Sequence, residues 1–195
     1  MGRHRPDPRR LRGAFPMKAT LNTERLILRL PEVGDAERIA FYLNNLAVSG
    51  NLARVPHPYF LGDAKAWLRT RRDDLPPEET NFTIEVPGQG LAGAVGYHIG
   101  LGGQPVIGYW LGQPFWGRGY MTEAARAALD WYFAVTDADR ILSGVFEFNI
   151  ASLNVQKKLG FTEIGRSSMH CLARNAEVRH IDTELTRKAW IGQQR

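Results

Sequence analysis

The spacing of hydrophobic residues divides the chain into strand-like and helix-like segments. Seven segments have the apolar or alternating pattern of strands bounded by turn residues: 24–30, 81–86, 91–100, 106–111, 140–148, 162–171 and 177–185. Helical spacing begins after residues 33–35 and recurs in 62–72, 122–135 and 149–159. In the first of these helices the predicted apolar stripe consists of Ile39, Phe41, Tyr42 and Leu46. The order β-α-α-β-β-β-α-β-α-β-β predicts an α/β protein of the α+β type, with a mixed, mostly antiparallel sheet of about seven strands and about four flanking helices.

Length and charge indicate one domain with a basic extension. The 195 residues are 44% hydrophobic, which suits one substantial core and is too little for two full domains. We expect a single domain at 20–195, preceded by a basic, flexible arm at 1–19. Residues 1–12 contain five Arg and one Asp, a net of +4 out of +5 for the whole chain. The nearly neutral body argues against nucleic acid as a partner, although RNA binding by the arm is kept as an alternative.

Other classes of protein are disfavoured by what the sequence lacks. No apolar run approaches the roughly 18 residues of a membrane span, and no apolar segment of a secretory signal is present. We therefore expect a cytoplasmic protein that does not bind membranes. The single cysteine, Cys171, has no partner for a disulfide, a metal site or a redox motif, so we predict no metal and a small buried residue in a strand.

The most informative segment is a junction between a strand and a helix, from Tyr109 to Ala124. An apolar strand pattern leads into Gly117 and Gly119 and then directly into a helix. The first four N–H groups of a helix have no intrahelical partners, and the helix dipole places partial positive charge there. Glycines permit the turn and let a phosphate approach the backbone closely. We therefore predict an anion site at this junction.

Two familiar phosphate loops do not match it. A Walker loop needs Gly-Lys-Ser/Thr where this chain has Gly119-Tyr120-Met121-Thr122, and a dinucleotide fingerprint needs a third glycine at Thr122. A lone Gly-x-Gly more often shapes only a turn. The interpretation as a ligand site therefore depends on a second motif.

That second motif is another junction between a strand and a helix, from Asn149 to Phe161. Either Ser152 or Asn149 is placed to cap the helix, and Gly160 is placed to end it in a left-handed conformation.

Together the two segments resemble the GNAT superfamily of acyl-CoA-dependent N-acetyltransferases, most closely the branch with the ribosomal-protein alanine N-acetyltransferases. The matching motifs are Thr23 to Arg29 in the opening strand, Gly108-Tyr109-Trp110, Trp116 to Ala124, Asn149 with Ser152, and Lys158 to Phe161. The resemblance covers about residue 20 to the end of the chain. It implies a GNAT-like fold and transfer of an acetyl group from acetyl-CoA to a primary amine, by direct attack in a ternary complex.

The resemblance also implies how acetyl-CoA is held. Backbone N–H groups from Trp116 to Thr122 would bind its diphosphate, with the Arg118 side chain adding charge. The pantetheine arm would lie along the strand edge from Tyr109 to Gly112, and an N–H near Leu111 would polarise the thioester carbonyl. The predicted cofactor-binding residues are Tyr109, Trp110, Leu111, Trp116, Gly117, Arg118, Gly119, Tyr120, Met121, Thr122, Asn149 and Lys158.

The transfer needs a proton for the departing thiolate, unless that leaves as the anion. Many superfamily members carry a tyrosine acid on the second motif helix, where this chain has Gln156, which cannot protonate a thiolate. Ser152 is the candidate catalytic residue, as the branch also suggests. A serine at this position is equally well explained as a helix cap.

No single base stands out. Family members often carry a carboxylate on the strand before Gly-Tyr-Trp, where this chain has Val106. Relay of the proton by water is one alternative. The other candidates, each equally readable as an ordinary strand or loop residue, are Glu85, His98, Glu147 and His57.

The acceptor amine is the least determined part. A protein N-terminal amine is favoured, and small amines such as an aminoglycoside, a polyamine or an amino acid derivative are alternatives. The loop at 48–61 is expected to line the acceptor pocket through His57 and Tyr59, whereas Trp67 fits either pocket or core. The departures at Gln156 and Val106 also allow a catalytically silent acyl-CoA-binding module. Both a monomer and a homodimer are compatible with the sequence.

Overall fold

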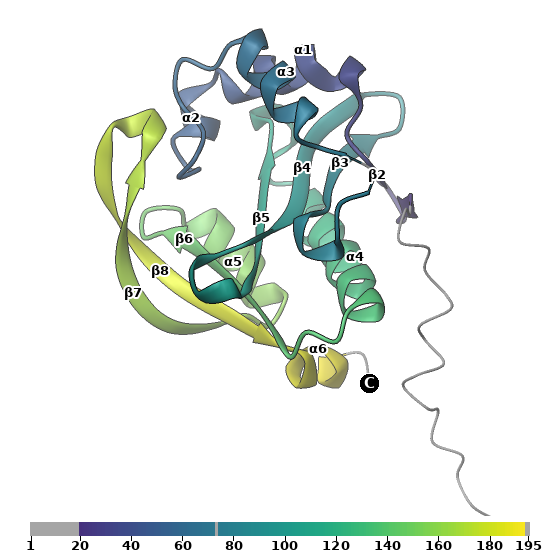
Figure 1. Ribbon diagram of the computed structural model, residues 1–195, viewed down its shortest axis with the longest axis vertical. Coiled ribbons are helices and arrows are strands. Elements are labelled where there is room, and N and C mark those ends of the chain that lie inside the picture. The colour runs from purple at the N-terminus through teal and green to yellow at the C-terminus, as the bar shows by residue number, and fades with distance from the viewer. Residues whose placement is uncertain (1–19, 73, 194–195) are drawn as a thin grey trace, which may run out of the picture.

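The computed structural model describes residues 20–72 and 74–193, so the predicted arm at 1–19 lies outside the described part of the chain. The described residues form one eight-stranded sheet with six α-helices around it (Figure 1). The strands are β1 (Leu21–Asn22), β2 (Ile27–Arg29), β3 (Asn81–Val86), β4 (Gly90–Ile99), β5 (Pro105–Leu111), β6 (Arg140–Phe146), β7 (Thr162–Cys171) and β8 (Ala176–Thr186). The helices are α1 (Ala36–Leu43), α2 (Leu46–Ser49), α3 (Leu61–Arg69), α4 (Tyr120–Val135), α5 (Ile150–Lys158) and α6 (Arg187–Gln193). The predicted mixed fold is confirmed, with one strand and two helices more than expected.

The sheet has the order β1-β2-β3-β4-β5-β6-β8-β7. Neighbouring strands are antiparallel except β5 and β6, which are parallel and pair only at Val106↔Leu142. By contrast, β4 and β5 pair continuously from Gly93↔Leu111 to Ile99↔Pro105. Beyond the single contact, β5 and β6 diverge, and this leaves an opening in the middle of the sheet.

The helices cover the two faces of the sheet differently. On one face, here called the α4 face, α4 and the ends of α5 and α6 close the larger core, in which Trp131 packs edge to face on Phe82 with ring centroids 5.0 Å apart. On the other, the α1 face, α1, α2 and α3 form a smaller core at one end of the sheet. Alternation along β5 directs Tyr109 to the α4 face and Trp110 to the α1 face.

The apolar stripe of α1 differs from the predicted one. Its buried residues follow the spacing i, i+3, i+4 and i+7: Ala36, Ile39, Ala40 and Leu43. Two of the predicted stripe residues are wrong, because Phe41 is 74% exposed and Leu46 is 44% exposed. The helix ends at Leu43, and the Asn45 side chain accepts from the Ala47 N–H at 2.9 Å and starts the separate helix α2.

The long β7–β8 hairpin reaches across to the loop after α2 (Figure 1). Leu172 N donates to Ala53 O at 3.0 Å, and Arg174 Nε donates to Gly50 O at 2.7 Å. Cys171 is fully buried at this contact, as predicted for a small strand residue. Within the described residues no helix is both long and apolar enough to cross a bilayer.

Candidate active site

The loop between β5 and α4 has the backbone that the predicted anion site requires. Gly117 and Gly119 have φ angles of 74° and 77°, in the left-handed region that favours glycine. Gly119 is the N-cap of α4 and therefore contributes no capping side chain. The first N–H groups of this 16-residue helix, on Tyr120, Met121 and Thr122, remain available to an anion.

A carboxylate in the first turn of α4 is neutralised by the segment before β2. Arg25 Nε donates to Glu123 Oε2 at 2.7 Å, and Thr23 Oγ1 donates to Glu123 Oε1 at 2.6 Å. Burial raises the pKa of Glu123, but the hydrogen bonds from Thr23 and Arg25 outweigh it and hold the pKa below its usual value. Arg25 Nη1 also donates to Arg118 O at 2.9 Å. The opening strand motif therefore braces the loop and pairs the negative charge beside it.

The edge of β5 is open to an extended ligand where β6 diverges. Backbone groups of a strand point alternately to its two neighbours. Gly112 N donates to Ala92 O in β4 at 2.8 Å, whereas Ile107 O accepts from Ser143 Oγ in β6 at 3.0 Å. The odd-numbered residues Tyr109 and Leu111 therefore direct their N–H groups into the opening. Leu111 O is occupied by the Trp116 indole, which donates to it at 2.8 Å.

Ser152 faces this opening from α5. Its helix is capped by Asn149, whose Oδ1 accepts from Ser152 N at 3.1 Å, so the Ser152 hydroxyl is not the cap. The Ser152 Oγ instead lies 3.0 Å from the Tyr109 hydroxyl. Burial raises the pKa of Tyr109 to about 12, and the hydrogen bonds to Ser152 and Gln156 oppose that rise. The helix cap is therefore Asn149 and not Ser152, and the catalytic role of Ser152 stays a prediction.

A helix N-terminus shaped by two left-handed glycines, beside an open strand edge, is an arrangement suited to a phosphate joined to an extended arm. The acetyltransferase (GNAT) domain family matches residues 25–162. The chain belongs to the GNAT acetyltransferase family. It is therefore an acyltransferase, with acetyl-CoA as its acetyl donor.

Individual relatives agree with this assignment. The chain is 29% identical over 150 residues to an uncharacterized N-acetyltransferase p20 of Bacillus licheniformis, covering 75% of this chain and 84% of the relative. A ribosomal-protein-S5-alanine acetyltransferase of Vibrio fischeri has a similar structure, with a TM-score of 0.73, 22% identity, and coverage of 88% of this chain and 98% of that one. A spermidine N-acetyltransferase of Vibrio cholerae, solved with CoA and spermine, gives a TM-score of 0.72, 19% identity, and coverage of 87% and 99%. At these identities the two structures show the fold alone.

In this acetyltransferase, Gln156 has a structural task that the sequence did not reveal. The side chain is buried, and its Nε2 donates to Ser143 Oγ in β6 at 2.9 Å. Its Oε1 accepts from Thr183 Oγ1 in β8 at 2.8 Å. Gln156 thereby fixes α5 to the two strands beside the opening, and with α5 the position of Ser152.

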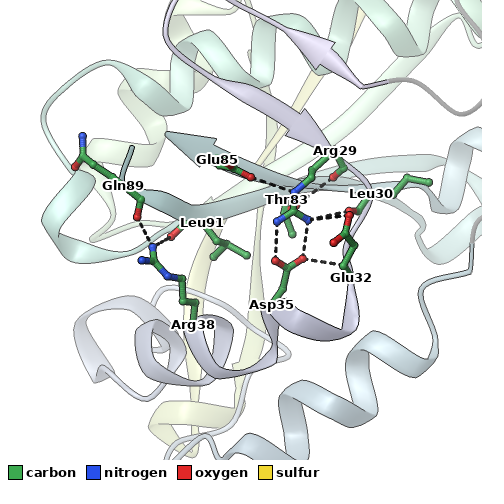
Figure 2. Close-up of polar contacts among 9 residues, drawn as sticks. All are labelled: Arg29, Leu30, Glu32, Asp35, Arg38, Thr83, Glu85, Gln89 and Leu91. Carbon is green, nitrogen blue, oxygen red and sulfur yellow. Dashed lines mark hydrogen bonds and ion pairs between the residues drawn. The ribbon is translucent and has the colours of Figure 1, made fainter. Parts of the chain in front are cut away.

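The two carboxylates among the candidate bases are engaged in ion pairs. Glu147 binds Arg166 at 2.8 Å and Arg179 at 3.1 Å. Glu85 accepts from Arg29 Nε at 3.1 Å (Figure 2). Neither is positioned as a free base at the opening.

The Arg29 cluster in Figure 2 holds β2 to the start of α1. Arg29 Nη1 and Nη2 donate to the two oxygens of Asp35 at 2.9 and 2.8 Å, and Asp35 is only 6% exposed. The hydrogen bond to Asp35 raises the pKa of Arg29 above its ordinary value, although burial opposes the rise. This cluster is structural, because its charges satisfy one another.

The two histidine candidates lie in different surroundings. His57 is exposed in the loop before α3. His98 lies on β4, opposite Val106, on the α1 face. Burial, followed by the charge of Arg54, lowers the pKa of His98 to about 4. His98 is therefore uncharged at neutral pH and a weak base.

A groove of about 1120 Å³ lies at the end of β5 on the side of α1. His57 and Tyr59 both line it, so the structure brings these two predicted pocket residues together. Burial, followed by the charge of Asp63, raises the pKa of Tyr59 to about 12. Trp67 is not among the lining residues and packs against the core of the α1 face.

Lys158, also predicted to bind the cofactor, lies at the opposite end of α5 from Asn149. It is exposed at the end of α5, where its carbonyl accepts from Arg126 Nη2 at 3.4 Å. Arg126 lies six residues into α4, about 9 Å along the helix at 1.5 Å per residue. The other predicted positions belong to β5, to the loop, to the first turn of α4 or to the N-cap of α5.

Proposed function

We propose that this acetyltransferase acts on the N-terminal amine of a protein and transfers the acetyl group directly in a ternary complex. The observation that carries the proposal is the character of the groove beside β5. Exposed apolar side chains line it, namely Phe41, Leu46, Phe60 and Leu61. Glu37 is the one carboxylate among its lining residues.

An apolar groove with one carboxylate fits a polypeptide better than a polyamine. A polyamine carries several positive charges, and each gains from a nearby carboxylate when it leaves water. A protein N-terminus brings one amine followed by backbone and side chains that an open groove can accommodate. The fold is shared with both the alanine acetyltransferase of Vibrio fischeri and the spermidine enzyme, so it is compatible with this acceptor but does not determine it.

The chemistry follows from the opening beside β5. The α4 N-terminus binds the diphosphate, and the pantetheine arm adds to the β5 edge as a strand would. The N–H of Tyr109 or Leu111 polarises the thioester carbonyl, with a contribution of about 3 to 4 kcal/mol judged by other oxyanion donors. Ser152 protonates the thiolate, and the Tyr109 hydroxyl at 3.0 Å holds Ser152 in place.

We expect the protein to be located in the cytoplasm.

The proposal is tested by release of CoA thiol from acetyl-CoA by the purified full chain. The acceptors are short peptides with different N-terminal residues, spermidine, an aminoglycoside and free amino acids. Peptides with blocked N-termini and free lysines are the matched controls. We expect kcat/KM for at least one free N-terminus to exceed that for spermidine by about 100-fold or more, equivalent to about 2.7 kcal/mol.

Two results would contradict the proposal in different ways. A higher kcat/KM for a small amine would make this a small-molecule acetyltransferase. Saturable acetyl-CoA binding without thiol release for any amine would indicate a silent acyl-CoA-binding module.

A further inference from the structure

Three glycines lie side by side on the α1 face, where the opening between β5 and β6 begins. Gly96 in β4 pairs with Gly108 in β5. Val106 in β5 pairs with Leu142 in the parallel strand β6, and Gly108 and Gly144 each come two residues later. Because parallel strands advance by the same rise per residue, Gly108 and Gly144 lie at the same level of the sheet. Gly108 is exposed, and no atom lies within 4 Å of the position that a Cβ would occupy there. There is thus open space over Gly108, beside the N–H of Tyr109.

An imidazole occupies the corresponding position over Gly144. A Cβ built on Gly144 would lie 2.0 Å from His180 Cε1 and 2.7 Å from His180 Nε2. The ring therefore rests directly on the Gly144 backbone, and only a glycine leaves room for it. Its Cε1 and Nε2 edge covers the strand that borders the opening.

The orientation of this ring is fixed by a carboxylate. His180 Nδ1 lies 2.8 Å from Asp182 Oδ1, two residues further along β8. Asp182 Oδ1 also accepts from Ser167 Oγ in β7 at 3.0 Å. Phe146 packs edge to face on the ring, with centroids 5.9 Å apart. Among the described residues, none forms a hydrogen bond with Nε2.

The acceptor amine has a proton to lose. An α-amino group has a pKa of about 7.7 to 8.0, and only its neutral form attacks a thioester. An imidazole whose Nδ1 donates to a carboxylate presents Nε2 as a proton acceptor, which is the arrangement that orients the base in hydrolytic triads.

We propose that His180, positioned by Asp182, is the general base that takes the proton from the acceptor amine. This inference rests on the proposed function. The neutral amine nitrogen bonds to the thioester carbon, and the proton that it then loses to become an amide passes to His180 Nε2. The C–S bond breaks, and the thiolate takes a proton from Ser152. The products are the amide and CoA thiol, after which His180 releases its proton to water and Ser152 regains one.

The base for the attacking amine and the acid for the departing sulfur lie on opposite faces of the sheet. His180 approaches from the α1 face, where a substrate meets open space over Gly108. Ser152 and Tyr109 lie on the α4 face. Other charged or titratable groups on the α1 face are His98, which the charge of Arg54 affects, and Glu184, which pairs with Arg140 at 3.1 Å.

The test compares His180→Gln, Asp182→Asn and Gly144→Ala with the wild type, using the peptide that the acceptor screen selects. We expect His180→Gln to lower kcat by about 10²-fold or more, with KM and the acetyl-CoA Kd changed less than about threefold. Asp182→Asn lowers kcat to a smaller extent. Gly144→Ala also lowers it, because the new methyl group displaces the ring. His170→Gln is the matched control, since His170 is an exposed histidine 3.3 Å from Glu177 at the far end of the same hairpin.

Two further readouts separate a base from a packing residue. In His180→Gln the pH profile of kcat should lose its imidazole limb and rise until the amine itself is deprotonated. Added imidazole should restore part of the activity of His180→Ala. The proposal is overturned if His180→Gln keeps kcat within about threefold of the wild type. It is equally overturned if activity falls only as far as the melting temperature does, with the pH profile unchanged and no rescue by imidazole.

Failure of the proposed function has a different signature. In that case the wild type itself releases no thiol with any peptide, and the base assignment falls with it. If His180→Gln does not fold, Asp182→Asn decides by the same criteria, because it keeps the size of the side chain.

Discussion

Replacing Gly119 with alanine tests whether the N-terminus of α4 binds the acetyl-CoA diphosphate. Gly119 has φ of 77°, and an L-residue held in that left-handed region costs about 1 to 2 kcal/mol. The added Cβ would lie 3.4 Å from Arg25 Nη2, which is an ordinary van der Waals distance, so the contact itself adds little. In the free protein the loop can relax away from the strained angle.

The bound state does not permit that relaxation, because the N–H groups point at the phosphate only while Gly119 stays left-handed. The strain is therefore paid mainly on binding, and we expect the acetyl-CoA Kd to rise about 5- to 30-fold, equivalent to about 1 to 2 kcal/mol. Isothermal titration calorimetry with acetyl-CoA measures this directly.

Gly102→Ala is the matched control. Gly102 has φ of 76° in the turn between β4 and β5, and nothing lies within 4 Å of its Cβ position. The strain is the same, but the position is not in the loop before α4. We expect a melting temperature lowered by a few degrees and an unchanged Kd. If both variants bind acetyl-CoA as the wild type does, or both lose affinity equally, the assignment of the loop is refuted.

Three further predictions concern the acid, the pH dependence and the charge cluster. Ser152→Ala should lower kcat by about 10²-fold without changing the acetyl-CoA Kd, and an unaltered rate of thiol release would exclude Ser152 as the proton donor. The pKa of His98 is about 4 when folded and about 6.5 when unfolded, so the folded state binds fewer protons and stability falls as pH drops from about 6.5 towards 4. His98→Gln should flatten this part of the unfolding free energy measured in urea, whereas an unchanged slope from pH 7.5 to pH 5 would contradict the assigned pKa. Arg29→Met leaves Asp35 buried without its partner and should lower the free energy of unfolding, measured in urea, by about 3 kcal/mol. Arg72→Met removes an exposed ion pair and should change this free energy little. Equal losses in the two variants would contradict the structural role of the Arg29 cluster.

The fold could be predicted where the hydrophobic pattern is long. The helix expected at 122–135 is observed at Tyr120–Val135, because eight of its residues are buried at helical spacing. The two-residue strand β1 and the four-residue helix α2 are too short for any period to show. Leu46 was misassigned because the expected helix ran past Leu43, whereas Phe41 lies within α1 but off its buried stripe.

The parts of the site formed by one continuous segment could be predicted from the sequence, whereas the parts formed by contacts between distant segments could not. The loop between β5 and α4, which is predicted to bind the diphosphate, is one continuous segment, so its glycines and the start of the helix were visible in the sequence. From the sequence, Gln156 indicated only that the tyrosine acid of other family members is missing. Its structural role could not be predicted, because its partners Ser143 and Thr183 lie on the strands β6 and β8. His180 carried one usable signal, an aspartate two residues away on the same face of a predicted strand. Its position over Gly144 depends on how β6 and β8 pair, which one sequence does not reveal.

In the proposed mechanism, the divergence of β5 from β6 lets the sheet separate the two proton transfers. A thioester carbonyl held in a gap between strands is reached from both faces of the sheet, whereas in a continuous sheet the ladder hydrogen bonds would close the gap. On the α4 face the Tyr109 hydroxyl, with its pKa raised to about 12, stays protonated at neutral pH and can return a proton to Ser152. On the α1 face the amine meets an imidazole that a carboxylate has already oriented. A base and an acid in direct contact would exchange their proton with each other. Because His180 and Ser152 lie on opposite faces of the sheet, His180 takes its proton from the reacting nitrogen and Ser152 gives its proton to the sulfur.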